Sequence, residues 1–343
     1  MNKIVLPQAA VLELTYRCNH QCIFCSCPWD APVANYKKGM ELDVDQWKMA
    51  VSKLYDRGIV AFSLSGGEVL LKDGFEEIIR HIRMEGNKRN LNHEIVLISN
   101  GRNMKEEYLK LFKENNVHLS MSLPGLTTFK EHTGVDNAEG VLRWFQIAKS
   151  YGLRTTVNVT VTKKNIHELF ETLSMGLLNG ADDALINRFL PGGRGLAHRS
   201  ELELSVEDVN TMLDTVEEVL QLARRYGNVG TEVARCAIRN PEKYKKLSMG
   251  YKCAAAKGFF VVDPSGNVRT CNHSPRIVGH IFHDDIITDI EYWNTFAFSD
   301  YHPESCKGCK LISQCDCGCR EVANILYGSP LSTDTTIVPG FRN

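Results

Sequence analysis

Between residues 11 and 190 the chain alternates two hydrophobic periods. Short runs rich in β-branched and apolar residues predict strands at 11–15, 59–65, 93–100, 117–123, 154–161 and 183–190. Amphipathic stretches with helical spacing, such as 43–58 and 75–86, lie between them. Six such units predict an α/β fold with a parallel sheet under helices, either an open doubly wound sheet or a partial barrel. In both, ligands gather at the C-terminal ends of the strands.

Three cysteines follow the first predicted strand, in the sequence Cys18-Asn-His-Gln-Cys22-Ile-Phe-Cys25. A structural zinc needs four ligands and a disulfide framework needs an even number, so three thiols fit neither. Thiolates on one short loop suit a [4Fe–4S] cluster whose fourth iron stays open. The alternatives are a group of buried cysteines or a partial zinc site.

Composition narrows the setting of these cysteines. The 343 residues include 40 basic and 41 acidic side chains, which gives no electrostatic support for nucleic-acid binding or for anionic membranes. The N-terminus lacks the apolar stretch of a signal peptide, and no apolar run approaches the roughly 20 residues that cross a bilayer. Twelve cysteines without an export signal predict metal ligation in a reducing cytoplasm.

Small polar groups also follow later predicted strands. They are Ser65-Gly66-Gly67-Glu68, Ser99-Asn100-Gly101, Ser122-Leu123-Pro124-Gly125 and, within the fifth strand, Asn158. A glycine pair after a strand often makes only a turn. Polar groups at four successive strand ends, beside a loop of three cysteines, predict a binding site.

The spacing CxxxCxxC, with Phe24 before the last cysteine and SGGE after the second strand, resembles the radical S-adenosylmethionine (radical SAM) superfamily over roughly residues 10–195. The resemblance implies a partial (β/α)6 barrel with a [4Fe–4S] cluster at its mouth, on Cys18, Cys22 and Cys25. S-adenosylmethionine would chelate the fourth iron, and its reductive cleavage would give a 5′-deoxyadenosyl radical that abstracts a substrate hydrogen atom.

The same resemblance implies cofactor-binding roles for the strand-end residues. Glu68, brought close by Gly66 and Gly67, would accept hydrogen bonds from the ammonium of S-adenosylmethionine. The carboxylate and the ribose hydroxyls of S-adenosylmethionine would contact small polar side chains, namely Ser99, Asn100, Ser122 and Asn158. Phe24 would lie near the adenine or pack in the core. Arg188 is either a substrate contact or a surface charge.

A long helix follows the six units, and the sequence pattern changes beyond it. Residues 205–227 predict a long helix, with Ser205 as N-cap, Asp208 completing a capping box and Gly227 as the stop. Residues 258–271 predict a hairpin, because Asp263-Pro-Ser-Gly266 has strong turn chemistry between two β-rich runs.

From Cys253 onward the chain holds seven cysteines, at Cys253, Cys271, Cys306, Cys309, Cys315, Cys317 and Cys319. Their spacing resembles the SPASM extension of radical SAM enzymes, a cysteine-rich iron–sulfur domain that holds one or two auxiliary [4Fe–4S] clusters. The resemblance implies a first cluster on Cys253, Cys271 and Cys319, and a second on Cys306, Cys309 and Cys315. A zinc ribbon on Cys306, Cys309, Cys315 and Cys319 is the alternative. We therefore divide the chain into a radical SAM core at 1–227, a linker at 228–250 and a SPASM domain at 251–343.

One ligand of the second cluster is missing from this pattern. The family usually has a final cysteine in a segment like TDPxC, and this chain has Thr333-Asp334-Thr335-Thr336-Ile337. Cys317 is the candidate replacement. Cys27 is either a support for the first cysteine loop or a bystander. Cys236 is a buried thiol, a cluster ligand, or a hydrogen-atom donor to a substrate radical.

The resemblance implies an enzyme that modifies a ribosomally made peptide, by crosslink, thioether or epimerisation. Asn272 stands where sulfatase-maturating relatives have an aspartate, which disfavours formylglycine formation. Seventeen residues precede Cys18, so we expect a separate leader-recognition protein or direct reading of the leader, together with a flavodoxin- or ferredoxin-type electron donor. The alternatives are oxidation or rearrangement of a small metabolite, and a non-catalytic iron–sulfur electron carrier.

Overall fold

The computed structural model describes residues 4, 6–33 and 36–337. Its centre is a run of six parallel strands in linear order, namely β1 (Ala9–Glu13), β2 (Ala61–Ser65), β3 (Glu94–Ser99), β4 (Val117–Ser122), β5 (Thr155–Val161) and β6 (Asp183–Arg188). All six predicted strands are confirmed, although β1 begins two residues before its predicted start. In this order β1 and β6 are not hydrogen-bonded neighbours, so the six strands form an open array.

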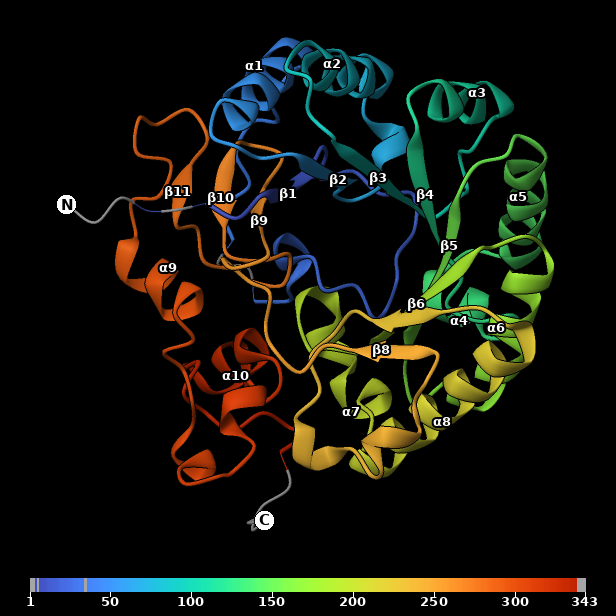
Figure 1. The fold of residues 1–343 in the computed structure, drawn as a ribbon, viewed down its shortest axis with the longest axis vertical. Coiled ribbons are helices and arrows are strands. Elements are labelled where there is room, and N and C mark those ends of the chain that lie inside the picture. The colour runs from blue at the N-terminus through green and yellow to red at the C-terminus, as the bar shows by residue number, and fades with distance from the viewer. Residues whose placement is uncertain (1–3, 5, 34–35, 338–343) are drawn as a thin grey trace.

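Helices connect these strands and lie around the outside of the array (Figure 1). They are α1 (Val44–Tyr55), α2 (Phe75–Lys88), α3 (Glu106–Glu114), α4 (Phe129–Thr133), α5 (Ala138–Ser150), α6 (Leu169–Leu178), α7 (Arg199–Leu202) and α8 (Val206–Ala223). Short 3-10 turns are η1 (Pro28–Asp30), η2 (Val69–Leu71), η3 (Ile166–Glu168), η4 (Gly193–His198), η5 (Arg235–Ala237), η6 (Pro241–Lys243), η7 (Glu304–Cys306) and η8 (Ile312–Gln314). The mixed α/β class predicted from the sequence is confirmed.

Helix α1 illustrates how the local sequence sets these elements. The Asp43 carboxylate accepts a hydrogen bond from the backbone N–H of Gln46 at 2.8 Å, and the Gln46 side chain accepts one from the N–H of Asp43 at 2.9 Å. The apolar residues Trp47, Val51 and Leu54 then recur on one face and are fully buried. The cap fixes where the helix begins, and the buried face fixes how it lies on the sheet.

Helix α8 begins as predicted but ends early. The Ser205 hydroxyl accepts from the N–H of Asp208 at 3.1 Å, which completes the predicted capping box. The helix ends at Ala223, because Arg224 takes a left-handed conformation with φ of 55°. The predicted stop at Gly227 is wrong, since Gly227 is the first residue of β7.

The sheet continues beyond the six strands at both edges. Strands β7 (Gly227–Val229) and β8 (Leu247–Met249) extend it next to β6. At the other edge, β9 (Phe259–Val262) pairs in parallel with β1, and the antiparallel strands β10 (Asn267–Arg269) and β11 (Gly279–His280) follow. The predicted hairpin is therefore confirmed. The predicted linker at 228–250 contributes to this eleven-stranded sheet, and the division into units stays a prediction.

The C-terminal part lies beside this sheet, with α9 (Ile290–Ala297) at the left of Figure 1 and α10 (Arg320–Tyr327) below it. Its aromatic residues pack against the end of the sheet. The ring centroids of Phe260 in β9 and Trp293 in α9 are 6.2 Å apart, and both side chains are buried. Among the residues that the structure describes, no helix is both long and apolar enough to cross a membrane.

Candidate functional site

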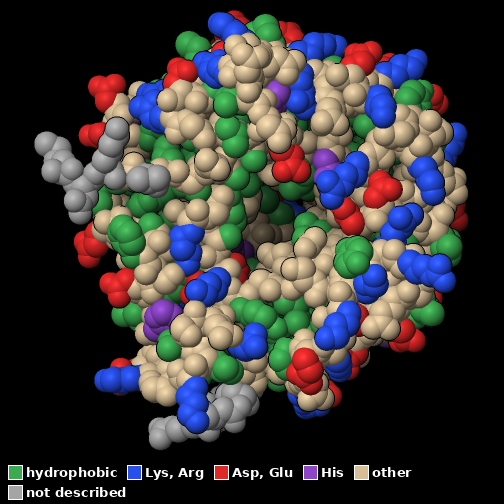
Figure 2. All heavy atoms as spheres, in the orientation of Figure 1, with side chains coloured by type: hydrophobic (Ala, Val, Ile, Leu, Met, Phe, Trp, Pro, Cys, Tyr) green, Lys and Arg blue, Asp and Glu red, His purple; other side chains and the backbone are tan. Residues whose placement is uncertain are grey.

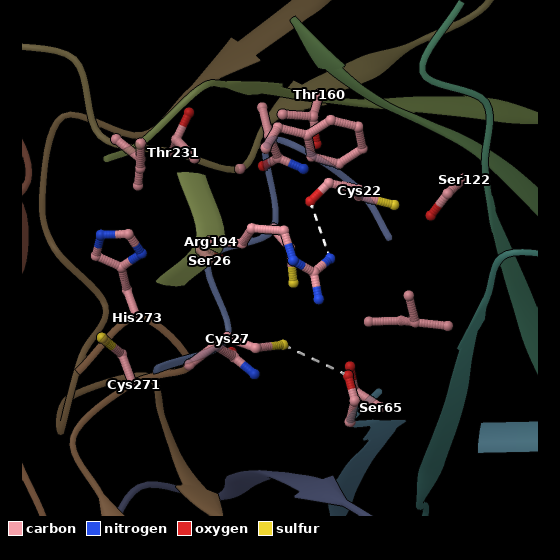
Figure 3. Close-up of a pocket in the computed structure, with 18 of the residues that line it drawn as sticks. Cys22, Ser26, Cys27, Ser65, Ser122, Thr160, Arg194, Thr231, Cys271 and His273 are labelled. Atoms are coloured by element: carbon pink, nitrogen blue, oxygen red, sulfur yellow. Dashed lines mark hydrogen bonds between the residues drawn. The ribbon is translucent and has the colours of Figure 1, made fainter. Parts of the chain in front are cut away.

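A cavity of about 440 Å³ opens at the C-terminal ends of the parallel strands. Figure 2 shows the corresponding hollow near the centre of this face, and Figure 3 shows part of its lining. Strand ends contribute Ser65, Ser99, Ser122 and Arg188. The cavity therefore lies at the edge of the sheet where the sequence predicted a ligand.

The loop with the first three cysteines borders this cavity and is held by backbone hydrogen bonds. The N–H groups of Gln21 and Ile23 donate to the carbonyls of Thr133 and His132, each at 2.9 Å, at the end of α4. The N–H of Gly195 in η4 donates to the carbonyl of Cys25 at 3.0 Å. Two distant segments thus fix the loop, so the positions of its thiols do not depend on the loop alone.

Cys18, Cys22 and Cys25 all line the cavity, and none of the three is in a disulfide. Burial raises the pKa of Cys18 to about 11 and raises the pKa of Cys22 well above its ordinary value. Negative charge on the neighbouring thiols raises both further. A hydrogen bond from the Cys27 thiol lowers the pKa of Cys25. Three thiols that line one cavity need a bound cation to become thiolates together, so this donor set fits an iron–sulfur cluster.

The two glycines before Glu68 are required by a close contact between loops. A Cβ on Gly67 would lie 2.2 Å from the carbonyl oxygen of Arg17, and one on Gly66 would lie 2.7 Å from that of Thr15. Gly66 also has a φ of 128°, which side chains disfavour. The loop after β2 therefore lies directly against the backbone that leads to Cys18.

Glu68 lies at this contact and is 2% exposed. Its carboxylate accepts hydrogen bonds from the Ser99 hydroxyl and the N–H of Asn100, both at 2.8 Å, and from the N–H of Leu70 at 3.1 Å. Burial raises the pKa of Glu68, and these donors oppose that rise. The ends of β2 and β3 thus hold one carboxylate in a fixed orientation at the cavity wall.

Most of the predicted cofactor-binding residues line the cavity, namely Phe24, Gly66, Gly67, Glu68, Ser99, Asn100 and Ser122. Asn158 is not among the lining residues. Its side-chain oxygen accepts a hydrogen bond at 3.0 Å from Asn187, which does line the cavity. Asn158 therefore reaches the site through Asn187.

Arg194 was not predicted as a site residue. It lines the cavity, donates to the carbonyl of Cys22 at 3.3 Å, and pairs with Asp30 at 3.0 Å (Figure 3). The Cys27 thiol donates to the carbonyl of Gly66 at 3.8 Å. Both contacts join the cysteine loop to other walls of the cavity.

Three C-terminal cysteines, Cys253, Cys271 and Cys319, line the same cavity. Figure 3 shows Cys271 and His273 away from Cys22 and Ser122, across the drawn space. Burial raises the pKa of all three thiols, and the charge of Glu232 raises each further. Glu232 also lines the cavity and was not predicted. Three soft thiol donors that line one cavity are the ligand set that an iron–sulfur cluster takes.

The other C-terminal cysteines line a second, small cavity. Its thiols are Cys236, Cys306, Cys309, Cys315 and Cys317. Cys319 borders the main cavity instead, so the structure separates it from the three cysteines with which a zinc ribbon would group it. Cys236, a candidate hydrogen-atom donor, is likewise absent from the described lining of the main cavity.

Arg188 is not a surface charge. It is 3% exposed and pairs with Asp334 at 3.2 Å, although one edge of it borders the main cavity. The sequence offered no signal for this pairing, because the partner lies 146 residues away.

Comparison with known proteins gives a consistent set of similarities. A family model described as the radical SAM superfamily matches residues 12–175. Over 343 aligned residues the chain is 27% identical to a PqqA peptide cyclase of Bradyrhizobium diazoefficiens, which covers 96% of this chain and 85% of that protein. A PqqA peptide cyclase of Rhodopseudomonas palustris is 27% identical, with 96% and 86% covered.

Solved structures match the fold over nearly the whole chain. Streptococcus suis SuiB bound to S-adenosylmethionine superposes with a TM-score of 0.72 at 17% identity, over 97% of this chain and 77% of that one. Native anSMEcpe with bound AdoMet superposes with a TM-score of 0.74 at 20% identity, over 96% and 94%.

Proposed function

Because this chain belongs to the radical SAM superfamily, we propose that it modifies a peptide substrate in the main cavity, between two groups of cluster-binding cysteines. Members of the family bind a [4Fe–4S] cluster and S-adenosylmethionine. When reduced, this pair supplies a 5′-deoxyadenosyl radical that abstracts a hydrogen atom from the substrate.

Cys18, Cys22 and Cys25 would hold three irons of that cluster. The proposal is supported by their shared place on one anchored loop, where all three thiols line the same cavity. Glu68 would accept hydrogen bonds from the ammonium of the cofactor. Ser99 and the N–H of Asn100 would act by orienting this carboxylate, since both already donate to it. Ser122 and the Asn187–Asn158 pair would supply further polar contacts.

Cys253, Cys271 and Cys319 would hold a first auxiliary cluster on another wall of the same cavity. The single observation that carries the proposal is this shared cavity, because it provides space for a substrate between the first three cysteines and the three C-terminal ones. Glu232, whose charge acts on all three thiols, would complete the ligand set or face the substrate.

A peptide is the substrate class that the comparisons favour. The relatives are named PqqA peptide cyclase, and two of the solved structures are titled SuiB bound to precursor peptide SuiA and anSMEcpe with Cp18Cys peptide. We propose a ribosomally made peptide, with a flavodoxin- or ferredoxin-type electron donor and a leader read directly or by a separate protein.

Anaerobic protein with reconstituted clusters tests this function in two steps. Dithionite and S-adenosylmethionine should give 5′-deoxyadenosine, measured by liquid chromatography. Co-expression with small peptides encoded beside the gene should then change one peptide, by a loss of two mass units or by deuterium uptake from solvent. Absence of 5′-deoxyadenosine from protein with a full complement of iron would refute the proposal.

A further inference from the structure

The small cavity gathers five cysteines from three separate segments of the chain. Cys236 lies in η5, Cys306 ends η7 and is followed by Cys309, and Cys315 and Cys317 precede α10. Soft thiolates gathered in this way select iron–sulfur clusters or zinc. The sequence pattern accounted for three of them and left the fourth ligand unassigned.

The segment around Cys236 is hydrogen-bonded directly to the C-terminal segment that carries Cys315. The N–H of Arg235 donates to Cys315 Sγ at 3.4 Å, and the N–H of Ala234 donates to the Thr336 hydroxyl at 3.3 Å. Ala234 is buried in a small apolar group against which Cys236 packs. Residues 234–236 therefore form one wall of this cavity.

Cys317 approaches from the same side as Cys315. Its N–H donates to Cys315 Sγ at 3.3 Å, and its thiol hydrogen-bonds with the thiols of Cys315 and Cys306. In a [4Fe–4S] cluster the four irons occupy alternate corners of a cube, so their outer ligands point away from one another. A thiol held against two other ligands is poorly placed to bind a fourth iron. The N–H of Cys317 instead stabilises the Cys315 thiolate, as the N–H of Arg235 does.

The residue expected at the missing ligand's place also borders this cavity. Ile337 stands where the TDPxC pattern has its cysteine; it is 8% exposed and contacts the same apolar group as Cys236. Ile337 and Cys236 thus both line the small cavity.

We propose that Cys236 is the fourth thiolate ligand of an iron–sulfur cluster in this small cavity, with Cys306, Cys309 and Cys315 as the other three. The proposal rests on the proposed function, because it assumes an auxiliary cluster of the same enzyme. The ligand set would then bridge the segment after β7 and the C-terminal cysteine loop.

The test uses the full chain with Cys18, Cys22 and Cys25 replaced by alanine, so that the remaining iron is auxiliary. Cys236→Ala, Cys236→Ser, Cys317→Ala and the control Ile312→Val are then added singly. Ile312→Val trims the same cavity without removing a thiol. Iron and acid-labile sulfide are measured together with the electron paramagnetic resonance and Mössbauer spectra of the reduced proteins.

We expect the parent to hold about eight irons, as two clusters of four. Cys236→Ala should lose the spectrum of one cluster, and Cys236→Ser should shift it, because an oxygen ligand replaces sulfur. Cys317→Ala and Ile312→Val should keep both. Parental iron and spectra in both Cys236 variants would overturn the proposal, as would a parent without auxiliary iron. Unchanged Cys236 variants would leave the proposed function standing, because radical formation is measured separately by 5′-deoxyadenosine from the unmodified protein. A parent without auxiliary iron would also remove the cluster proposed on Cys253, Cys271 and Cys319.

Discussion

The guanidinium of Arg188 at the end of β6 donates to both carboxylate oxygens of Asp334, at 3.3 and 3.2 Å. Both side chains are almost completely buried. Asp334 also accepts from the N–H of Cys319 at 3.1 Å and from that of Thr336 at 2.8 Å. One carboxylate thus joins β6, the last of the six parallel strands, to a cysteine of the main cavity and to the backbone of Thr336.

Asp334→Ala should therefore be strongly destabilising. Removing one partner of a buried pair leaves the other charge unpaired, which costs about 3–5 kcal/mol. Anaerobic urea unfolding would measure the loss. Glu207→Ala is the control, because it removes an exposed partner of Arg239 and should change stability little. Equal midpoints for the two variants would contradict this view of Asp334.

Replacing Cys18, Cys22 and Cys25 together by alanine should abolish the formation of 5′-deoxyadenosine. The auxiliary iron should remain, because Cys253, Cys271 and Cys319 come from other segments. Iron analysis and chromatography of the same sample test both statements. Continued release of 5′-deoxyadenosine would show that the radical-forming cluster lies elsewhere.

Glu68→Gln should weaken the binding of S-adenosylmethionine. The amide keeps the size of the side chain but loses the charge that would face the cofactor ammonium. A hydrogen bond to a charged group contributes about 1.5–3 kcal/mol, so affinity should fall roughly 10- to 150-fold. Equilibrium binding to the reconstituted protein measures this, with the exposed Glu107→Gln as control. Equal affinities for both variants would remove Glu68 from the cofactor site.

His132 should make stability depend on pH. Burial lowers its pKa below the ordinary value, and its Nδ1 donates to the carbonyl of Thr128 at 3.0 Å. As the pH falls through about 6.5, the imidazole is protonated in the unfolded chain but stays neutral in the folded protein. Stability is retained above that pH and falls as pH falls below it. His132→Gln should reduce the fall of the urea midpoint between pH 7.5 and 5.5, while the exposed His167→Gln should leave that fall unchanged.

A cysteine at position 337 should compensate for the loss of Cys236. If both positions face one cluster, the double variant Cys236→Ala with Ile337→Cys should regain iron and the spectrum that Cys236→Ala loses. The single variant Ile337→Cys serves as the control. No recovery in the double variant would argue against a shared site for the two positions.

The parallel strands and the site at their ends could be predicted because both depend on local sequence. Strands such as β4 and β5 are short, largely buried runs of residues with high β-propensity, and their C-terminal ends share one edge of the sheet. The end of α8 was missed because Arg224, a residue without the conformational freedom of glycine, takes the left-handed conformation.

Contacts between distant segments could not be predicted in the same way. Arg194 lies in the short 3-10 turn η4 and Glu232 lies outside the named elements, and neither segment has a periodic sequence pattern. The partner of Arg188 and the neighbours of Cys236 depend on how the C-terminal part packs, and no local signal encodes that packing. For Cys236 the sequence supplied three possible roles, and its position beside Cys306 and Cys315 favours the ligand role.

The parallel pairing of β1 with β9 has a consequence for engineering. Ala9–Leu12 are matched residue by residue with Phe259–Val262, so the first strand is completed by a segment about 250 residues later. A fragment that stops before β9 would leave an apolar strand edge bare and invite aggregation. Chimeras that exchange the C-terminal part with that of a relative would therefore need a matching graft of the first strand.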